Sequence, residues 1–374
     1  MPAGSKSDVR LVSFSIETWK ALTSARVILC WLAIWLSGML TYDYYVRIEA
    51  PRIQQRISVH YKILSGSAPY EYRYRILLPY TAEAVARLIQ QFPMVRSHPA
   101  IQPLSYSKRA FILAYCSLNI TALVIFLVCI GQLIWRMFTY HLALLGIFVS
   151  AFLVNFTFRD QYFHPWSFWE GAFFALGLLL IHRQQYWLFS GVSLLALINR
   201  ETSLFLLVAF LFCTLPQEWS KSSFAKALMK RDVRFAVGNL MIWGVGFLIL
   251  HQLVGYGSTT VSVGSNLSGN RVNFEYTVLL NFLLFGFVWP LVVRGMYLSP
   301  LFIRRSAMML PAYLGLLLVI GSWWEIRYWV TVIPIVVPAL IAAIASVPSA
   351  AERGVALPRH PSYFQGAAPQ WPSA

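Results

Sequence analysis

Charged residues are scarce in this sequence. Only 12% of its 374 residues are Asp, Glu, Lys or Arg, whereas a soluble domain carries roughly 25%. Hydrophobic residues make up 58% of the chain, and several apolar runs reach the ~17–25 residues that a helix needs to cross a bilayer. Because these runs are continuous rather than alternating, they exclude a membrane β-barrel. The sequence therefore predicts an all-α polytopic membrane protein.

Acidic residues and cysteines are also few. There are 14 acids against 30 Lys and Arg, a formal net charge of +16. The basic residues are scattered between apolar runs, a pattern that sets membrane orientation and contacts lipid head groups and that argues against nucleic-acid binding. The four cysteines, Cys30, Cys116, Cys129 and Cys213, all lie inside apolar runs and none belongs to a CxxC pattern. Neither a zinc site nor a disulfide framework is indicated.

A signal-peptide cleavage pattern is missing before the first apolar run, so this run is expected to stay as a helix. Basic residues precede it, which places segment 1–21 in the cytoplasm. Residues 22–347 form the predicted transmembrane domain, without a fixed-period repeat. The tail 348–374, rich in Pro, Ala and Ser, is expected to be disordered and cytoplasmic.

We expect about ten transmembrane helices: Leu22–Tyr42, Ala110–Trp135, Tyr140–Phe156, Trp166–Ile181, Tyr186–Ile198, Thr202–Leu215, Phe235–Val254, Tyr276–Val293, Ala307–Ser322 and Trp329–Val347. The first outer loop, 43–109, holds two amphipathic stretches, Pro51–Leu64 and Ile76–Phe92, which predict helices along the membrane interface. The fifth and sixth runs are interpreted as two helices because one helix would exceed the bilayer by several turns. This choice puts the basic segment Pro216–Arg234 in the cytoplasm.

Four acids lie within a few residues of a predicted outer helix end: Asp43, Asp160, Glu201 and Glu325. Arginines accompany the last three as Arg159, Arg200 and Arg327. Ionisable groups at membrane depth are candidates for a functional site, and four on one face favour a shared cavity. Each is also compatible with a helix cap or an ion pair, most readily Arg200–Glu201 and Glu325–Arg327.

Such a cavity has a definite chemistry. A carboxylate can act as general base for a hydroxyl or amine acceptor, and arginines suit a lipid-linked phosphate. Arg73 and Arg75 in the first outer loop are further candidates for that phosphate. His164 could orient a substrate, and Glu170, one turn into the fourth helix, is expected to line the cavity or to pair with an arginine.

Several short patches resemble the GT-C superfamily of membrane glycosyltransferases. They are Tyr42-Asp43-Tyr44-Tyr45 after the first helix, the passage from His60 through Tyr72-Arg-Tyr-Arg-Ile-Leu-Leu-Pro79, Asp160 in the second outer loop, Gly191 through Ala196-Leu-Ile-Asn-Arg-Glu-Thr202, and Glu325-Ile-Arg-Tyr328 with Pro334. The resemblance implies an inverting transferase, of a small bacterial type, that takes a sugar from a polyprenyl-phosphate donor. Its catalytic base would be Asp43, and Asp160 would serve the acceptor or a metal. Many members carry two adjacent acids after the first helix; the pair Asp43-Tyr44 departs from this pattern and puts a divalent metal in doubt.

Three functions are therefore carried forward. The first is a glycosyltransferase that acts on a lipid, glycan or polymer acceptor outside the cytoplasm. Asp43 and Asp160 are its catalytic candidates, and Arg73, Arg75, His164, Arg200, Glu201, Glu325 and Arg327 its substrate-binding candidates. The second is a transporter or flippase for a lipid-linked glycan, which needs a cationic cavity but no base. The third is a polysaccharide polymerase or ligase.

Overall fold

The computed structural model of the protein describes residues 24–92, 106–158, 164–215, 226, 229–254, 268–269, 271–275, 279, 286, 288–320 and 325–346. Every regular element within these ranges is helical. The longer elements are α2 (Ala25–Tyr44), α3 (Ile53–Leu64), α5 (Leu77–Ile89), α6 (Tyr106–Met137), α7 (Tyr140–Thr157), α8 (Trp166–His182), α9 (Tyr186–Asn199), α10 (Leu204–Thr214), α12 (Arg231–Val254), α15 (Val288–Leu298), α17 (Leu310–Ile320) and α18 (Ile333–Ala345). The shorter ones are α4 (Tyr70–Arg73), α16 (Leu301–Ala307) and four short π- or 3-10-helical segments, Tyr45–Glu49, Ala50–Arg52, Glu201–Ser203 and Ile326–Thr331.

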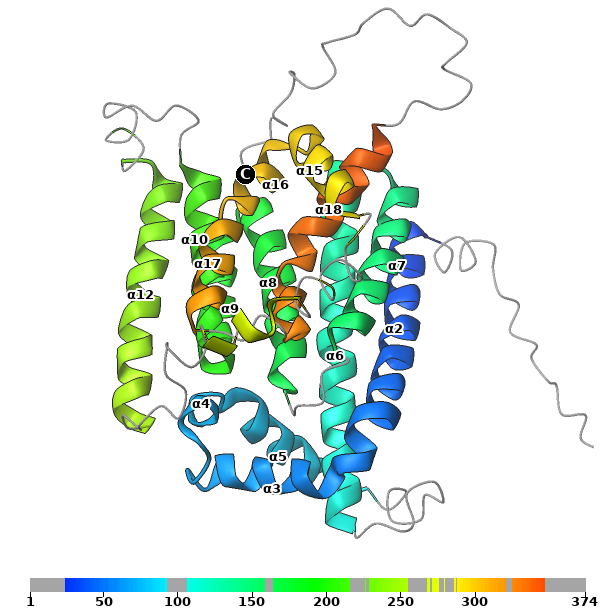
Figure 1. Ribbon diagram of the computed structural model, residues 1–374, viewed down its shortest axis with the longest axis vertical. Helices are drawn as coiled ribbons and strands as arrows, with labels where there is room; N and C mark the ends of the chain where they lie inside the picture. The colour runs from blue at the N-terminus through cyan, green and yellow to red at the C-terminus, as the bar shows by residue number, and fades with distance from the viewer. Residues whose placement is uncertain are drawn as a thin grey trace, which may run out of the picture.

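Most of the long helices run side by side in a bundle (Figure 1). Its centre is formed by α8 and α18, which are buried on nearly every side. Both are apolar all round, as expected for helices that lie inside a bundle. In contrast, α2 and α12 turn large apolar side chains outward, including Trp31, Trp35, Met241 and Leu248. Exposed apolar faces of this kind are typical of helices that contact lipid.

Four helices among the described residues are long and apolar enough to cross a membrane: Ala25–Leu64, Lys108–Met137, Tyr140–Thr157 and Arg231–Val254. Five shorter apolar helices accompany them: Trp166–His182, Tyr186–Asn199, Glu201–Thr214, Val288–Leu298 and Ile333–Ala345. The predicted all-α fold is therefore confirmed, and its apolar helices are those of a membrane protein. The larger count of about ten spans stays a prediction.

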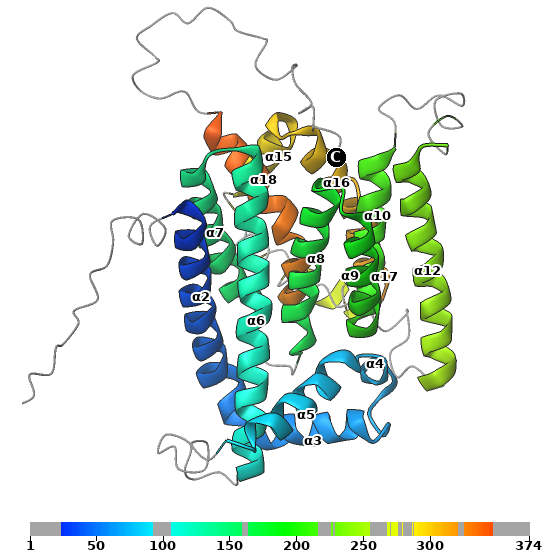
Figure 2. The same ribbon diagram turned by 180° about the vertical axis from the view of Figure 1, so that it is seen from behind.

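The described part of the predicted first outer loop folds into a layer of helices. After α2 the chain stays helical through a π-helical turn, Tyr45–Glu49, and a short turn, Ala50–Arg52, and bends into α3. The helices α3, α4 and α5 then lie across one end of the bundle (Figures 1 and 2). His60 of α3 fixes this layer, because its Nδ1 lies 2.9 Å from the Tyr115 hydroxyl of α6 and its Nε2 lies 3.6 Å from a carboxylate oxygen of Glu83 in α5. Both amphipathic stretches of this loop thus form helices, as predicted.

The predicted helices and the structure differ most late in the chain. The eighth helix was expected at Tyr276–Val293, but the described helix α15 begins at Val288 and ends at Leu298. Most of the residues from 276 to 287 lie outside the described ranges, as do 1–23 and 347–374, which include both predicted terminal segments. The ninth run contains α17, and the tenth contains α18 preceded by the short turn Ile326–Thr331.

Candidate functional site

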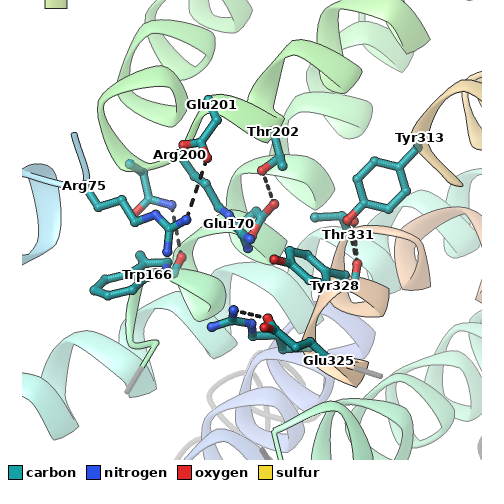
Figure 3. A network of polar contacts seen from close by, with 12 residues as sticks. Arg75, Trp166, Glu170, Arg200, Glu201, Thr202, Tyr313, Glu325, Tyr328 and Thr331 are labelled. Atoms are coloured by element: carbon teal, nitrogen blue, oxygen red, sulfur yellow. Dashed lines mark hydrogen bonds and ion pairs between the residues drawn. The ribbon is translucent and has the colours of Figure 1, made fainter. Parts of the chain in front are cut away.

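A network of charged and aromatic side chains lies at the end of the bundle that the α3–α5 layer covers (Figures 1 and 3). Its members come from the first turns of α8, the turn between α9 and α10, the turn before α18, and the segment that follows α4. These segments are up to about 250 positions apart in the sequence, since Arg75 and Glu325 belong to the same network. Packing of the apolar helices therefore brings these charged segments, which lie at helix ends, into contact.

Glu170 and Arg200 form the buried centre of the network. Arg200 Nη1 donates to Glu170 Oε2 at 2.5 Å, and both side chains are 2% exposed. The Thr202 hydroxyl donates to the other carboxylate oxygen of Glu170. Burial lowers the pKa of Arg200, but Glu170, Tyr328, Glu201 and Tyr313 together outweigh burial and raise the pKa, so Arg200 stays charged. The expectation that Glu170 pairs with an arginine is confirmed.

Arg75 and Glu201 form a looser pair at the edge of this centre. Arg75 Nη2 lies 3.7 Å from Glu201 Oε1, and the Glu201 side chain is 45% exposed whereas that of Arg75 is 8% exposed. The Arg75 guanidinium also lies 4.9 Å from the ring centre of Trp166, a cation–π contact. Burial raises the pKa of Glu201, but Arg75 and Arg200 outweigh it and hold the pKa below its ordinary value. The predicted direct ion pair between Arg200 and Glu201 is therefore wrong, because each residue pairs with a different partner. The two charges still interact electrostatically.

The third pair joins Glu325 and Arg327, as predicted from their spacing. Tyr328 connects it to the centre, because the guanidinium groups of Arg200 and Arg327 lie 4.7 Å and 5.2 Å from its ring centre. The backbone carbonyl of Tyr328 accepts a hydrogen bond of 2.8 Å from the Tyr313 hydroxyl of α17. Three arginines and three glutamates thus share one network, with Tyr328 between two of the pairs.

Aromatic stacking attaches the segment after α4 to the bundle. Tyr72 stacks on His164 with ring centres 6.2 Å apart, and lies 5.5 Å from the Trp166 ring. Tyr74 stacks on His251 of α12 at 4.0 Å. His164 therefore lies beside the network, as its place among the candidates suggested. His251, which the sequence did not single out, fixes the position of the loop that carries Arg75.

Asp43 lies in a separate pocket on the other side of the first turn of α8. Its carboxylate pairs with Arg47 Nε at 2.6 Å and is 31% exposed. The pocket has a volume of about 30 Å³ and is lined by Leu40, Asp43, Tyr44, Arg47, Ile48, Val154, Asn155, Phe158 and Phe168. A volume of this size holds one or two water molecules. Phe168 of α8 forms one wall, and Trp166, two residues earlier, lies under Arg75.

The predicted donor arginines do not reach this pocket. Arg75 is directed to Glu201 and Trp166, and Arg73 Nε donates to the Ala68 carbonyl oxygen at 2.7 Å, a bond within its own loop. Neither residue is among those that line the pocket around Asp43. Asp160, the second catalytic candidate, lies outside the described residues.

Sequence reasoning named all six charged residues of this network but did not predict the role of its aromatics. Trp166, Tyr72 and Tyr328 carry the cation–π contacts, yet in a chain with 16% aromatic residues no spacing set them apart. Within the described ranges, no group of three His, Cys, Asp or Glu is arranged to hold a metal ion.

The comparisons with known proteins identify no relative. The chain matches no model of a protein family, no curated protein and no solved structure. The resemblance to GT-C glycosyltransferases therefore stays a prediction from the short patches that carry it.

Proposed function

We propose that the protein is an inverting glycosyltransferase of the plasma membrane, which transfers a sugar from a polyprenyl-phosphate donor on the side away from the cytoplasm. The observation that carries the proposal is that Asp43, in the last turn of α2, and the three-arginine network lie at the same end of the bundle, the end that the α3–α5 layer covers. Amphipathic helices at a membrane interface suit a site that a long isoprenoid chain enters from the bilayer.

Asp43 is the proposed general base. It would take the proton of an acceptor hydroxyl, whose oxygen then bonds to the anomeric carbon of the sugar. The bond between this carbon and the phosphate oxygen breaks with its electron pair, and polyprenyl phosphate leaves. Arg47 Nε lies 2.6 Å from the Asp43 carboxylate and holds it in place at the edge of the pocket.

Arg75, which lies outside the Asp43 pocket at the same end of the bundle, is proposed to attract and hold the donor phosphate there. Its partner Glu201 is 3.7 Å away and partly exposed, so a phosphate could replace it more easily than it could replace Glu170 beside Arg200. A guanidinium offers parallel donors that match phosphate oxygens. Arg200 and Arg327 are each paired with their own glutamate, so we do not assign them to the phosphate. Both guanidinium groups contact the Tyr328 ring and would hold it in position.

The orientation of the protein belongs to the same proposal. The ends of α6, α8 and α12 and the short helix α16 lie at the bundle end opposite the network (Figure 1). At or beside these helices the described residues include Arg136, Arg183, Lys230, Arg231, Arg304 and Arg305. Basic residues in short loops favour the cytoplasmic side. We therefore assign that end, and the N-terminus, to the cytoplasm.

The test is the release of polyprenyl phosphate by the purified protein from a panel of polyprenyl-phosphate-linked monosaccharides. We expect Asp43→Asn to lower the rate by about 10²–10⁴-fold, the usual contribution of a general base. Asp232→Asn, in the first turn of α12 at the opposite end, is the matched control and should keep the full rate. An unchanged rate in the Asp43→Asn variant would disprove the assignment. Movement of the intact donor between leaflets without release would instead establish a flippase.

A further inference from the structure

A second charged cluster lies at the opposite end of the bundle, away from the proposed catalytic site. Arg26 is in the first turn of α2, Arg136 in the last turn of α6, and His182 and Arg183 at the end of α8. These three helices are neighbours, since α6 packs against both α2 and α8 (Figure 2). Their ends bring four basic side chains from distant parts of the sequence to one place.

Arg183 is held in a fixed position within this cluster. Its Nη2 donates to the side-chain carbonyl oxygen of Gln132 in α6. The turn that follows α8 is tight, with Gln185 N bonded to the Leu180 carbonyl at 2.9 Å and Gln184 at a φ of 58°. A non-glycine residue in this left-handed conformation is uncommon and marks a turn that the surrounding structure imposes. The guanidinium is therefore fixed rather than free to move away from the neighbouring arginines.

The cluster lacks a balancing acid in the part of the chain that the structure describes. No ion pair there involves Arg26, Arg136 or Arg183. Burial lowers the pKa of Arg183, and the charges of Arg136 and Arg26 lower it further. The Nε atom of Arg183 is buried and has no hydrogen-bond partner among the described residues. Like charges held together in this way favour the binding of an anion.

An apolar surface begins within one turn of these charges. On the outer face of α2, Ile28, Trp31 and Trp35 are 40%, 63% and 58% exposed. Their spacing of three and four residues places them in one stripe along the helix. A free phosphate ion would use only the basic cluster, whereas a phospholipid would place its head group on the cluster and its acyl chains along this stripe.

We propose that the ends of α2, α6 and α8 form a binding site for the head-group phosphate of an anionic phospholipid, with Arg26, Arg136 and Arg183 as its ligands. The proposal is independent of the glycosyltransferase assignment, because it uses no residue of that site. It also gives the exposed face of α2 a specific occupant rather than bulk lipid.

The experiment is a lipid competition measured by native mass spectrometry on the full-length protein in neutral detergent. Equal amounts of phosphatidylglycerol and phosphatidylcholine are added, and the ratio of bound lipids is read. We expect the wild-type protein to favour phosphatidylglycerol, and Arg136→Gln and Arg183→Gln each to reduce this preference about fivefold. Arg136 is exposed, so its replacement should leave the fold intact. Arg136→Lys keeps the charge and should keep most of the preference.

Arg231→Gln is the matched control, since Arg231 lies at the same end but over the Phe235 ring of α12. It should leave the ratio unchanged. Equal binding of both lipids by the wild-type protein would overturn the proposal, as would an equal loss in the Arg231→Gln variant, which would indicate a general surface charge. Displacement of phosphatidylglycerol by millimolar inorganic phosphate would reveal a site for a free anion and would likewise overturn the lipid assignment.

Discussion

At the scale of single residues, Glu170 is the acid on which the network depends most. It neutralises Arg200 at a position where both side chains are 2% exposed. We predict that Glu170→Gln destabilises the protein by about 3–5 kcal/mol, because a buried guanidinium is left without its charge partner. Thermal unfolding of the purified protein in detergent measures the effect.

The matched control for this prediction is Arg87→Gln. Arg87 forms an exposed pair with Glu83, 3.0 Å away and one helical turn earlier in α5. Loss of such a pair costs about 0.2–1 kcal/mol. If Glu170→Gln unfolds as Arg87→Gln does, the buried pair does not hold the network together.

The same residues mark the limit of what the sequence could predict. The ion pairs Asp43–Arg47 and Glu325–Arg327 join residues four and two positions apart, so local spacing brings them together. The partner of Arg200 is thirty positions away, and the partner of Glu201 is in another loop. Their adjacent positions in the sequence suggested an Arg200–Glu201 pair. In the folded chain, Glu170 of α8 lies closer to Arg200, and Arg75 pairs with Glu201.

At the scale of helices, α15 and α18 approach each other closely at Gly295. A Cβ atom added at Gly295 would lie 1.9 Å from the Ala339 carbonyl oxygen, a backbone atom that cannot move away alone. We predict that Gly295→Ala separates the two helices and costs about 1–3 kcal/mol, as overpacking of a core does. Thermal unfolding of the variant measures this cost.

Gly238→Ala in α12 is the control for the helix contact, because nothing lies within 4 Å of a Cβ atom there. Alanine favours a helix over glycine by up to about 1 kcal/mol, so this variant should be as stable as the wild type or slightly more so. An equally stable Gly295→Ala variant would show that the α15–α18 contact has room to relax.

The presence of most helices could be predicted, because a long apolar run indicates a helix. α7 was expected at Tyr140–Phe156 and ends one residue later, at Thr157. The junction after α2 was not predictable in the same way. The sequence suggested a break at Asp43, but the chain remains helical through the π-helical turn Tyr45–Glu49 and bends only where Pro51 enters the next turn. Hydrophobic periodicity does not distinguish such turns from loops.

At the scale of the whole molecule, the two ends of the bundle have opposite characters. The three Arg–Glu pairs and Asp43 lie at the end that the α3–α5 layer covers. The described residues at the other end are mostly basic, with few acids. The distribution of charge along the sequence predicted this division, since alternate loops fall on alternate sides. It could not predict that Asp43 and Arg75 lie on different sides of the first turn of α8, because that depends on how the loop helices fold back.

The central claim is that the end that holds Asp43 and Glu201 faces away from the cytoplasm. It is tested by single cysteines in a variant whose four native cysteines are replaced by alanine. Glu201→Cys reports on one end and Lys230→Cys on the other, and both positions are exposed. A membrane-impermeant maleimide is added to right-side-out vesicles before and after permeabilisation. We predict that Glu201→Cys reacts at once and that Lys230→Cys reacts only after permeabilisation. The reverse pattern would contradict the account, because a donor on the outer leaflet could not then reach the site.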